Sequence, residues 1–116
     1  MSSEGTPNFS ITESSGSEGV RIELVGELDI SVAGRVRDRL DRLGAAGATV
    51  ILDLSKLDFI DSSGINVIIT YHRQAAQDGW NLLVDQQLAL PVRRVFNVMG
   101  LNDVFWPRPE AVEPSS

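Results

Sequence analysis

The chain has 116 residues, 42% of them hydrophobic, and a formal net charge of −6, which fits one soluble globular domain. It contains no cysteine and one histidine, so disulfides, cysteine nucleophiles and multi-histidine metal sites are excluded. The acidic balance opposes direct binding of a nucleic acid backbone. Neither a signal peptide nor an apolar run of the roughly 18 residues that a membrane-spanning helix needs is recognisable, and we expect a cytoplasmic protein without a membrane partner.

Both ends of the chain are polar and rich in residues that break helices and strands. Residues 1–7 are predicted to form a flexible start, and residues 107–116, which carry three prolines, a flexible tail. Phe9 and Ile11 indicate a short strand before a turn over residues 13–19. The folded domain is therefore predicted to span residues 8–106.

The first half of this domain begins with strand, helix and strand patterns. Residues 20–25 alternate with a period of two and predict a strand that stops at Gly26. Apolar residues at helical spacing over residues 32–43 predict a helix that ends before Gly44. The near-continuous apolar run over residues 50–54 predicts a central strand that is covered on both faces.

The second half repeats the alternation. A helix is predicted over residues 65–77, followed by Gly79 and a short strand over residues 80–84. A last helix begins at Pro91, a residue suited to the first helical turn, and stops at Gly100. The alternation of strands and helices predicts a single α/β domain with a mostly parallel sheet.

A polar turn, Asp61-Ser62-Ser63-Gly64, follows the central strand and opens a helix. The carboxyl ends of parallel strands meet at one sheet edge, where ligands and partners bind, so this turn should lie beside residues 27–29. At a helix N-terminus the unpaired N–H groups and the helix dipole favour negative charge. A serine placed there is either a helix cap or a phosphate acceptor, and the spacing leaves both interpretations open.

Other chemistries have less support. Ser62 as a hydrolase nucleophile needs a nearby base, but His72 lies ten residues along the same helix, about 15 Å away. His72 shares its helical spacing with apolar residues and is interpreted as a core-edge residue. Asp29 and Asp61 could bind a metal together, but two carboxylates in common loops are weak support, so no metal site and no catalytic residue is predicted.

A stripe of arginines marks the first predicted helix. Arg35, Arg39 and Arg42 lie on it, with Asp38 and Asp41 beside them. Asp38 and Arg42 have the acid-first i, i+4 order that favours a salt bridge. The pattern predicts a solvated, ion-paired face rather than a specific anion site.

Three motifs, in this order and spacing, resemble the STAS domain and, within it, bacterial anti-sigma-factor antagonists. They are Gly-Glu-Leu-Asp at residues 26–29, Leu-Asp-Leu at residues 52–54, and Phe-Ile-Asp-Ser-Ser-Gly-Ile at residues 59–65. The resemblance covers about residues 8–105. The first and third motifs together are fairly specific, whereas neither would be so alone.

The resemblance implies a protein that switches partners and is not an enzyme. The unphosphorylated antagonist would bind an anti-sigma factor that is also a serine kinase, which frees a sigma factor, for instance under stress. The kinase would then phosphorylate the first serine after the aspartate, here Ser62, and a serine phosphatase would restore the cycle. Asp61, Ser63 and Gly64 would shape the turn that the kinase reads, with Asp29 beside it. No cofactor is implied for this chain, because ATP belongs to the kinase.

The sequence departs from the family pattern in two places. Asn66 and Thr70 stand where the family often has small residues, on one helical stripe with Arg73 and Gln77. They are predicted to contact the partner and to influence which kinase fits. The usual amphipathic C-terminal helix is missing or shortened, and a proline-rich end from Pro107 replaces it.

Two other functions compete with this hypothesis. One is a non-phosphorylated STAS scaffold, as a subunit of a lipid-transport ATPase or of a large stress-sensing assembly. The other is an enzyme that uses Asp29 and Asp61, which predicts metal-dependent turnover.

Overall fold

The computed structural model describes residues 2–6 and 8–107. Within these residues the strands are β1 (Ser2–Thr6), β2 (Phe9–Gly16), β3 (Gly19–Leu28), β4 (Thr49–Ile60) and β5 (Asn81–Val84). The helices are α1 (Ala33–Ala45), α2 (Ser62–Asp78), α3 (Leu90–Met99) and α4 (Asn102–Phe105). None of these helices has the length and apolar content needed to cross a lipid bilayer.

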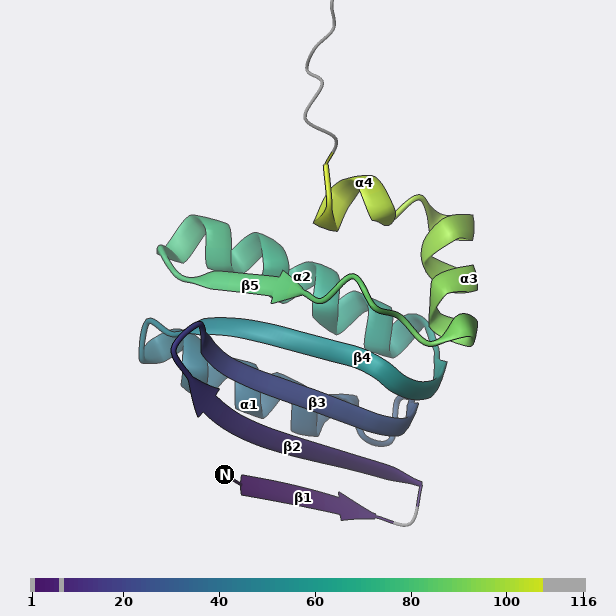
Figure 1. Ribbon diagram of the computed structural model, residues 1–116, viewed down its shortest axis with the longest axis horizontal. Coiled ribbons are helices and arrows are strands. Elements are labelled where there is room, and N and C mark those ends of the chain that lie inside the picture. Colours follow the sequence, from purple (N-terminus) through teal and green to yellow (C-terminus); the bar gives the residue numbers. More distant parts are fainter. Residues whose placement is uncertain (1, 7, 108–116) are drawn as a thin grey trace, which may run out of the picture.

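The strands form one sheet in the order β1-β2-β3-β4-β5, shown in Figure 1. The neighbours β3, β4 and β5 are parallel, and β1 and β2 extend this unit with antiparallel pairs. Helix α1 connects β3 to β4, and α2 connects β4 to β5. The predicted α/β class is therefore confirmed.

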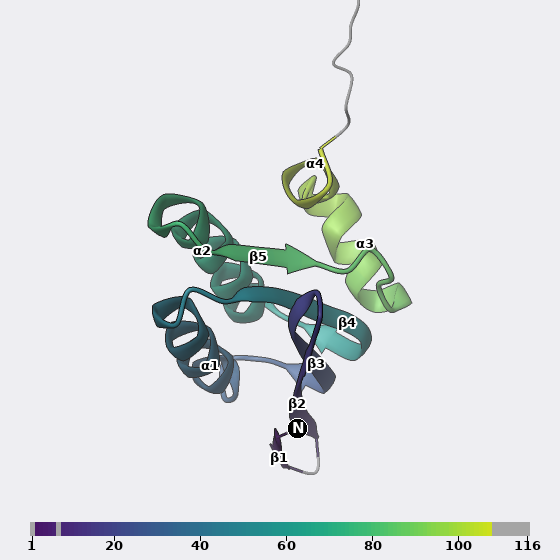
Figure 2. The same ribbon diagram turned by 60° about the vertical axis from the view of Figure 1, so that its left-hand side comes forward.

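Helices α1 and α2 lie side by side on one face of the sheet. Helices α3 and α4 lie on the other side of β5 from α2 (Figure 2). The core between the sheet and the two long helices is apolar. Its fully buried members include Ile22, Leu24, Val36, Leu40, Leu52 and Ile68. This packing fixes the two helices against the strand ends that carry the site.

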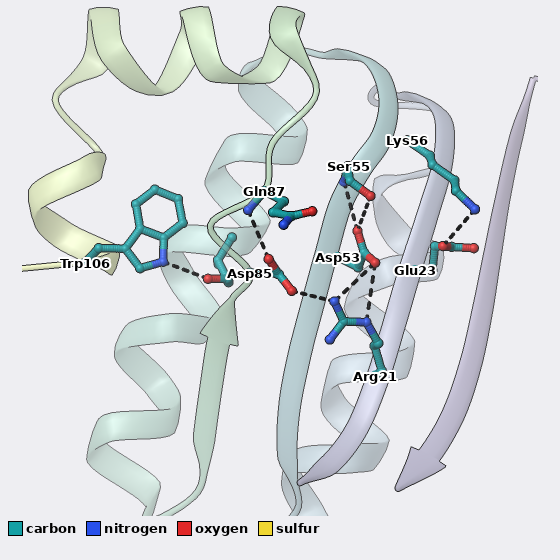
Figure 3. A network of polar contacts seen from close by, with 9 residues as sticks. Arg21, Glu23, Asp53, Ser55, Lys56, Asp85, Gln87 and Trp106 are labelled. Carbon is teal, nitrogen blue, oxygen red and sulfur yellow. Dashed lines mark hydrogen bonds and ion pairs between the residues drawn. The ribbon is translucent and has the colours of Figure 1, made fainter.

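The opposite face of the sheet carries a polar network (Figure 3). Arg21 of β3 donates to Asp85, after β5, over 2.5 Å and to Asp53 of β4 over 3.4 Å. Asp53 also accepts hydrogen bonds from the N–H and the hydroxyl of Ser55. This network joins β3, β4 and the segment that leads to α3.

Two strands extend beyond their predicted ends. Strand β3 passes through Gly26, where the register with β4 shifts and φ is +99°. A Cβ atom at Gly26 would lie 2.2 Å from the carbonyl oxygen of Asn8, so this glycine makes an irregularity within the strand, not its end. Strand β4 continues to Ile60, because Leu57 and Ile60 remain buried while Lys56 faces solvent.

The N-terminal segment differs from the flexible start predicted for residues 1–7. Residues 2–6 form β1 and pair antiparallel with β2. Pairing of this kind uses backbone groups and needs no apolar side-chain pattern. The turn predicted over residues 13–19 shortens to residues 17–18, because β2 continues to Gly16. Of the predicted tail, residues 108–116 lie outside the described residues.

The C-terminal part packs through aromatic rings. The indole N–H of Trp106 donates to the carbonyl oxygen of Val84 over 2.8 Å, which anchors the end of α4 to β5. Phe96 lies beside the rings of Phe105 and Trp106. The ring of His72 meets Phe105 edge-on at 4.8 Å between centroids, so the interpretation of His72 as a core-edge residue is confirmed.

Candidate functional site

The polar turn between β4 and α2 is held by Asp61. This residue is the N-cap of α2, and its Oδ1 accepts a hydrogen bond from the N–H of Gly64 over 3.1 Å. Its Oδ2 accepts from the N–H of Ile30 over 3.2 Å. One carboxylate therefore fixes both the start of α2 and the loop between β3 and α1.

Asp29 lies at the same sheet edge, as predicted. Leu28 and Ile60 are register partners, so Asp29 and Asp61 follow directly after a paired position. The Asp29 carboxylate accepts from the hydroxyl of Ser31 over 2.6 Å and from its N–H over 2.9 Å. The hydroxyl bond above all keeps the pKa of Asp29 below its usual value. Asp29 and Asp61 thus act as acceptors that organise two neighbouring turns.

The turn separates its two serines. Ser62, the first residue of α2, is exposed, whereas Ser63 is half-buried. Gly64 is buried, and a Cβ atom there would lie 2.7 Å from Cγ of Leu28. Because Asp61 supplies the cap, the hydroxyl of Ser62 is not needed for capping, and Ser62 is an exposed residue at the helix N-terminus.

A groove of about 430 Å³ runs between the β3–α1 loop, α1 and α2; we call it the α1–α2 groove. The residues that line it include Ile30, Ser31, Arg37, Ser63, Asn66 and Thr70. Three residues predicted to contact a partner, Ser63, Asn66 and Thr70, therefore share one concave surface beside the turn.

Ile30 and Arg37 are among the groove residues that the sequence reasoning missed. Ile30 exposes 78% of its surface, although it is a large apolar residue. Its position directly after Asp29 was the available signal. Arg37 stands on the polar face of α1, but only the placement of α2 makes that face a wall of the groove.

A hydrogen bond joins the two helices that form the groove. The hydroxyl of Tyr71 in α2 donates to Asp41 in α1 over 2.5 Å. Burial, and next this hydrogen bond, raise the pKa of Tyr71 to about 12. The phenol is therefore neutral at physiological pH and acts as a hydrogen-bond donor.

The solvated, ion-paired arginine stripe predicted for α1 is confirmed in part: two of its three arginines form ion pairs, but Arg39 and its partner are only 13% and 15% exposed. Arg39 and Arg42 bind Glu13 of β2 at 3.0 and 2.7 Å. The structure thus pairs Arg42 with Glu13, where the sequence pattern indicated Asp38. The arginines reach β2 because that strand lies beside β3, a tertiary arrangement that helical spacing does not contain.

Comparisons with known proteins agree with this architecture. A family model described as "Mlab, STAS domain" matches residues 11–107. The anti-sigma-B factor antagonist of Bacillus subtilis (strain 168) is 24% identical over 97 residues, which cover 84% of this chain and 88% of that protein.

Solved structures show the same fold. An anti-sigma factor antagonist from Mycobacterium paratuberculosis superimposes with a TM-score of 0.72 at 17% identity, covering 89% of this chain and 88% of that one. The anti-sigma factor antagonist SpoIIAA in its unphosphorylated form gives a TM-score of 0.67 at 26% identity, with 78% and 81% covered. Its phosphorylated form, described as a Bacillus cell fate determinant, gives 0.63 at 26% identity, with 79% and 85% covered. The chain described here belongs to the STAS domain family.

Proposed function

We propose that this protein is an anti-sigma-factor antagonist that is switched off by phosphorylation at Ser62. The observation that carries the proposal is the division of roles in the turn: Asp61 caps α2 and leaves Ser62 exposed at the helix N-terminus. The similarity to SpoIIAA, which has been solved in unphosphorylated and phosphorylated forms, supports it.

In this proposal the partner is an anti-sigma factor that is also a serine kinase. Binding it releases a sigma factor in the cytoplasm, in response to stress, and a serine phosphatase restores the unphosphorylated protein. Ser63, Asn66 and Thr70 line the groove next to Ser62 and contact the partner. Asp29, Asp61 and Gly64 hold the shape of the turn through the internal contacts described above.

Electrostatics explain how one phosphate acts as the switch. A phosphoserine adds about −1.5 to −2 charges, which the dipole of α2 tolerates, so the fold survives. The carboxylates of Asp29 and Asp61 lie at the same sheet edge, and their repulsion of the phosphate offsets part of the stabilisation by the dipole. Inside a complementary interface the same phosphate is desolvated, and a loss of about 3–4 kcal/mol weakens binding a few hundred-fold or more.

The test measures affinity for the anti-sigma factor kinases of the native host, each purified and titrated in turn. We expect Ser62→Ala to bind one of them as tightly as the wild type, and Ser62→Asp to bind at least tenfold more weakly. Ser17→Asp, at an exposed position of the β2–β3 turn, adds the same charge elsewhere and should bind normally. Equal affinities of the Ser62→Ala and Ser62→Asp variants would refute the switch.

A second candidate function is favoured by the description "Mlab, STAS domain" of the matching family model. In this alternative the protein is a non-phosphorylated STAS subunit of a lipid-transport ATPase. Purification of the tagged protein from its host separates the two functions. Recovery with a membrane ATPase, and with no phosphate on Ser62 by mass spectrometry, would favour the subunit role.

A further inference from the structure

We propose that Arg37 selects the partner: its guanidinium pairs with a carboxylate on a segment of the anti-sigma factor that lies in the α1–α2 groove, with an apolar side chain of that segment covering Ile30. This inference rests on the proposed function and adds the chemistry that the partner must present.

Arg37 is a cation with no ion-pair partner among the described residues. Arg39 and Arg42 of the same helix bind Glu13, and Arg21 binds Asp53 and Asp85. Arg37, by contrast, is exposed, and within residues 8–107 it forms no hydrogen bond or ion pair. A planar guanidinium in this state can donate two parallel hydrogen bonds to the oxygens of one carboxylate.

The charges around the groove favour an acidic group at Arg37. Arg37 is the charged member of the residues found to line it. Asp41, four residues after Arg37 in α1, accepts a hydrogen bond from the hydroxyl of Tyr71, and Asp29 and Asp61 accept hydrogen bonds from turn N–H groups. Because the whole chain carries a net charge of −6, much of its remaining surface repels an acidic segment. Arg37 therefore gives the acidic side chain of such a segment one favourable position in the groove. This position fixes the orientation in which the segment binds.

Ile30 supplies the apolar end of the same surface. It is 78% exposed, lines the groove, and its N–H is held by Asp61, next to Ser62. This hydrogen bond to the capping carboxylate holds the backbone of Ile30 in place, so the loop itself does not have to be ordered on binding. An apolar side chain of the partner that covers Ile30 thus lies close to the phosphorylated position.

The experiment compares charge reversals on the two faces of α1. Each host anti-sigma factor kinase is titrated against the wild type, Arg37→Glu and Arg35→Glu. Arg35 is on α1 but does not line the groove. Because both variants replace an arginine by a glutamate, they have the same net charge. We expect Arg37→Glu to weaken binding at least tenfold and Arg35→Glu less than threefold. Replacing the paired acidic residue of the kinase by arginine should restore the affinity of Arg37→Glu.

A second pair of variants tests the apolar contact. Ile30→Ser should weaken binding, whereas Val98→Ser, which changes an 86% exposed residue on α3 outside the groove, should not. All four variants change exposed or half-buried side chains, and their thermal unfolding checks that the fold is intact.

The outcomes separate this inference from the proposed function. If the wild type binds a kinase and both charge reversals act equally, general electrostatics explains the effect and the role of Arg37 is overturned. If Arg37→Glu binds like the wild type, the role of Arg37 is also overturned, while the switch at Ser62 stands. If no host kinase binds the wild type, both proposals fail.

Discussion

The side chain of Asp61 accepts a hydrogen bond from the backbone N–H of Ile30, which lies 31 residues earlier in the sequence. The same carboxylate caps α2 through Gly64. The turn that carries Ser62 and the loop that carries the exposed Ile30 are therefore parts of one unit. A partner that contacts both meets a surface organised before binding.

Removing this carboxylate should destabilise the protein. Asp61→Ala deletes the N-cap, which is worth about 0.5–2 kcal/mol, and returns the N–H of Ile30 to water, so we expect a total loss of about 1–3 kcal/mol. Asp61→Asn keeps one carbonyl oxygen that can cap Gly64 and should lose less. Urea unfolding of both variants measures these differences. An alanine variant as stable as the wild type would contradict the assigned role of Asp61.

Gly64 should not tolerate a side chain, although alanine favours helices. A Cβ atom there would lie 2.7 Å from Cγ of Leu28 and 2.9 Å from Cγ1 of Ile60. Overpacking of this kind costs about 1–3 kcal/mol, and it opposes a helix-propensity gain of at most about 1 kcal/mol. We expect Gly64→Ala to lower the free energy of unfolding.

Gly34 provides the matched control for this substitution. It also lies in the first turn of a helix, but a Cβ atom there would meet only Nη1 of Arg37, at 3.8 Å. Gly34→Ala should leave stability unchanged or raise it by up to about 1 kcal/mol. Thermal unfolding of the two variants side by side checks the prediction, and an equal change in both would argue against the close packing of Gly64.

Tyr71 is the sole tyrosine of the chain, so its titration can be followed by ultraviolet absorbance. Burial and the hydrogen bond to Asp41 raise its pKa to about 12 in the folded protein, against about 10 when unfolded. Because the folded pKa is the higher one, the stabilisation is complete below pH about 10 and is lost as pH rises toward the folded value. Asp41→Asn should lower the folded pKa without abolishing the shift, since burial remains. Identical midpoints in native and urea-unfolded protein would contradict the buried phenol.

Asp85 should make the protein sensitive to acid. The N–H of Gln87, and then the guanidinium of Arg21, hold the pKa of Asp85 below its usual value. A lowered folded pKa stabilises the protein above the unfolded value of about 4, and this contribution disappears as pH falls through the folded pKa. Urea unfolding between about pH 5 and pH 2 should show a steeper loss for the wild type than for Asp85→Asn. Parallel curves would exclude this contribution.

Local chemistry made much of the fold predictable. The helices that became α1, α2 and α3 follow from apolar spacing, and Gly79 and Gly100 end the last two of them in the left-handed conformation. Helix α2 begins at Ser62, three residues before the predicted helix of residues 65–77, because the Asp61 cap draws the polar turn into the first helical turn. These features depend on neighbours a few residues apart, which a sequence displays directly.

Other features depend on contacts between distant segments. Strand β1 forms through backbone pairing with β2, and Gly26 bends β3 against Asn8 instead of ending it. Arg42 reaches Glu13 across 29 residues. No local pattern encodes such partners, because they are set by the register of the sheet and by the packing of α1 on it.

By itself, the sequence determined the class of the fold, the strand-to-helix turn and the serine in it, since periodicity, capping preference and motif spacing are local properties. Only the tertiary structure decided that Asp61 takes the capping role, that Ser62 is exposed, and that Arg37 and Ile30 line the same groove. The physical reason is that a groove between two helices exists only after both have packed on the sheet. The groove is therefore lined by residues that lie far apart in the sequence.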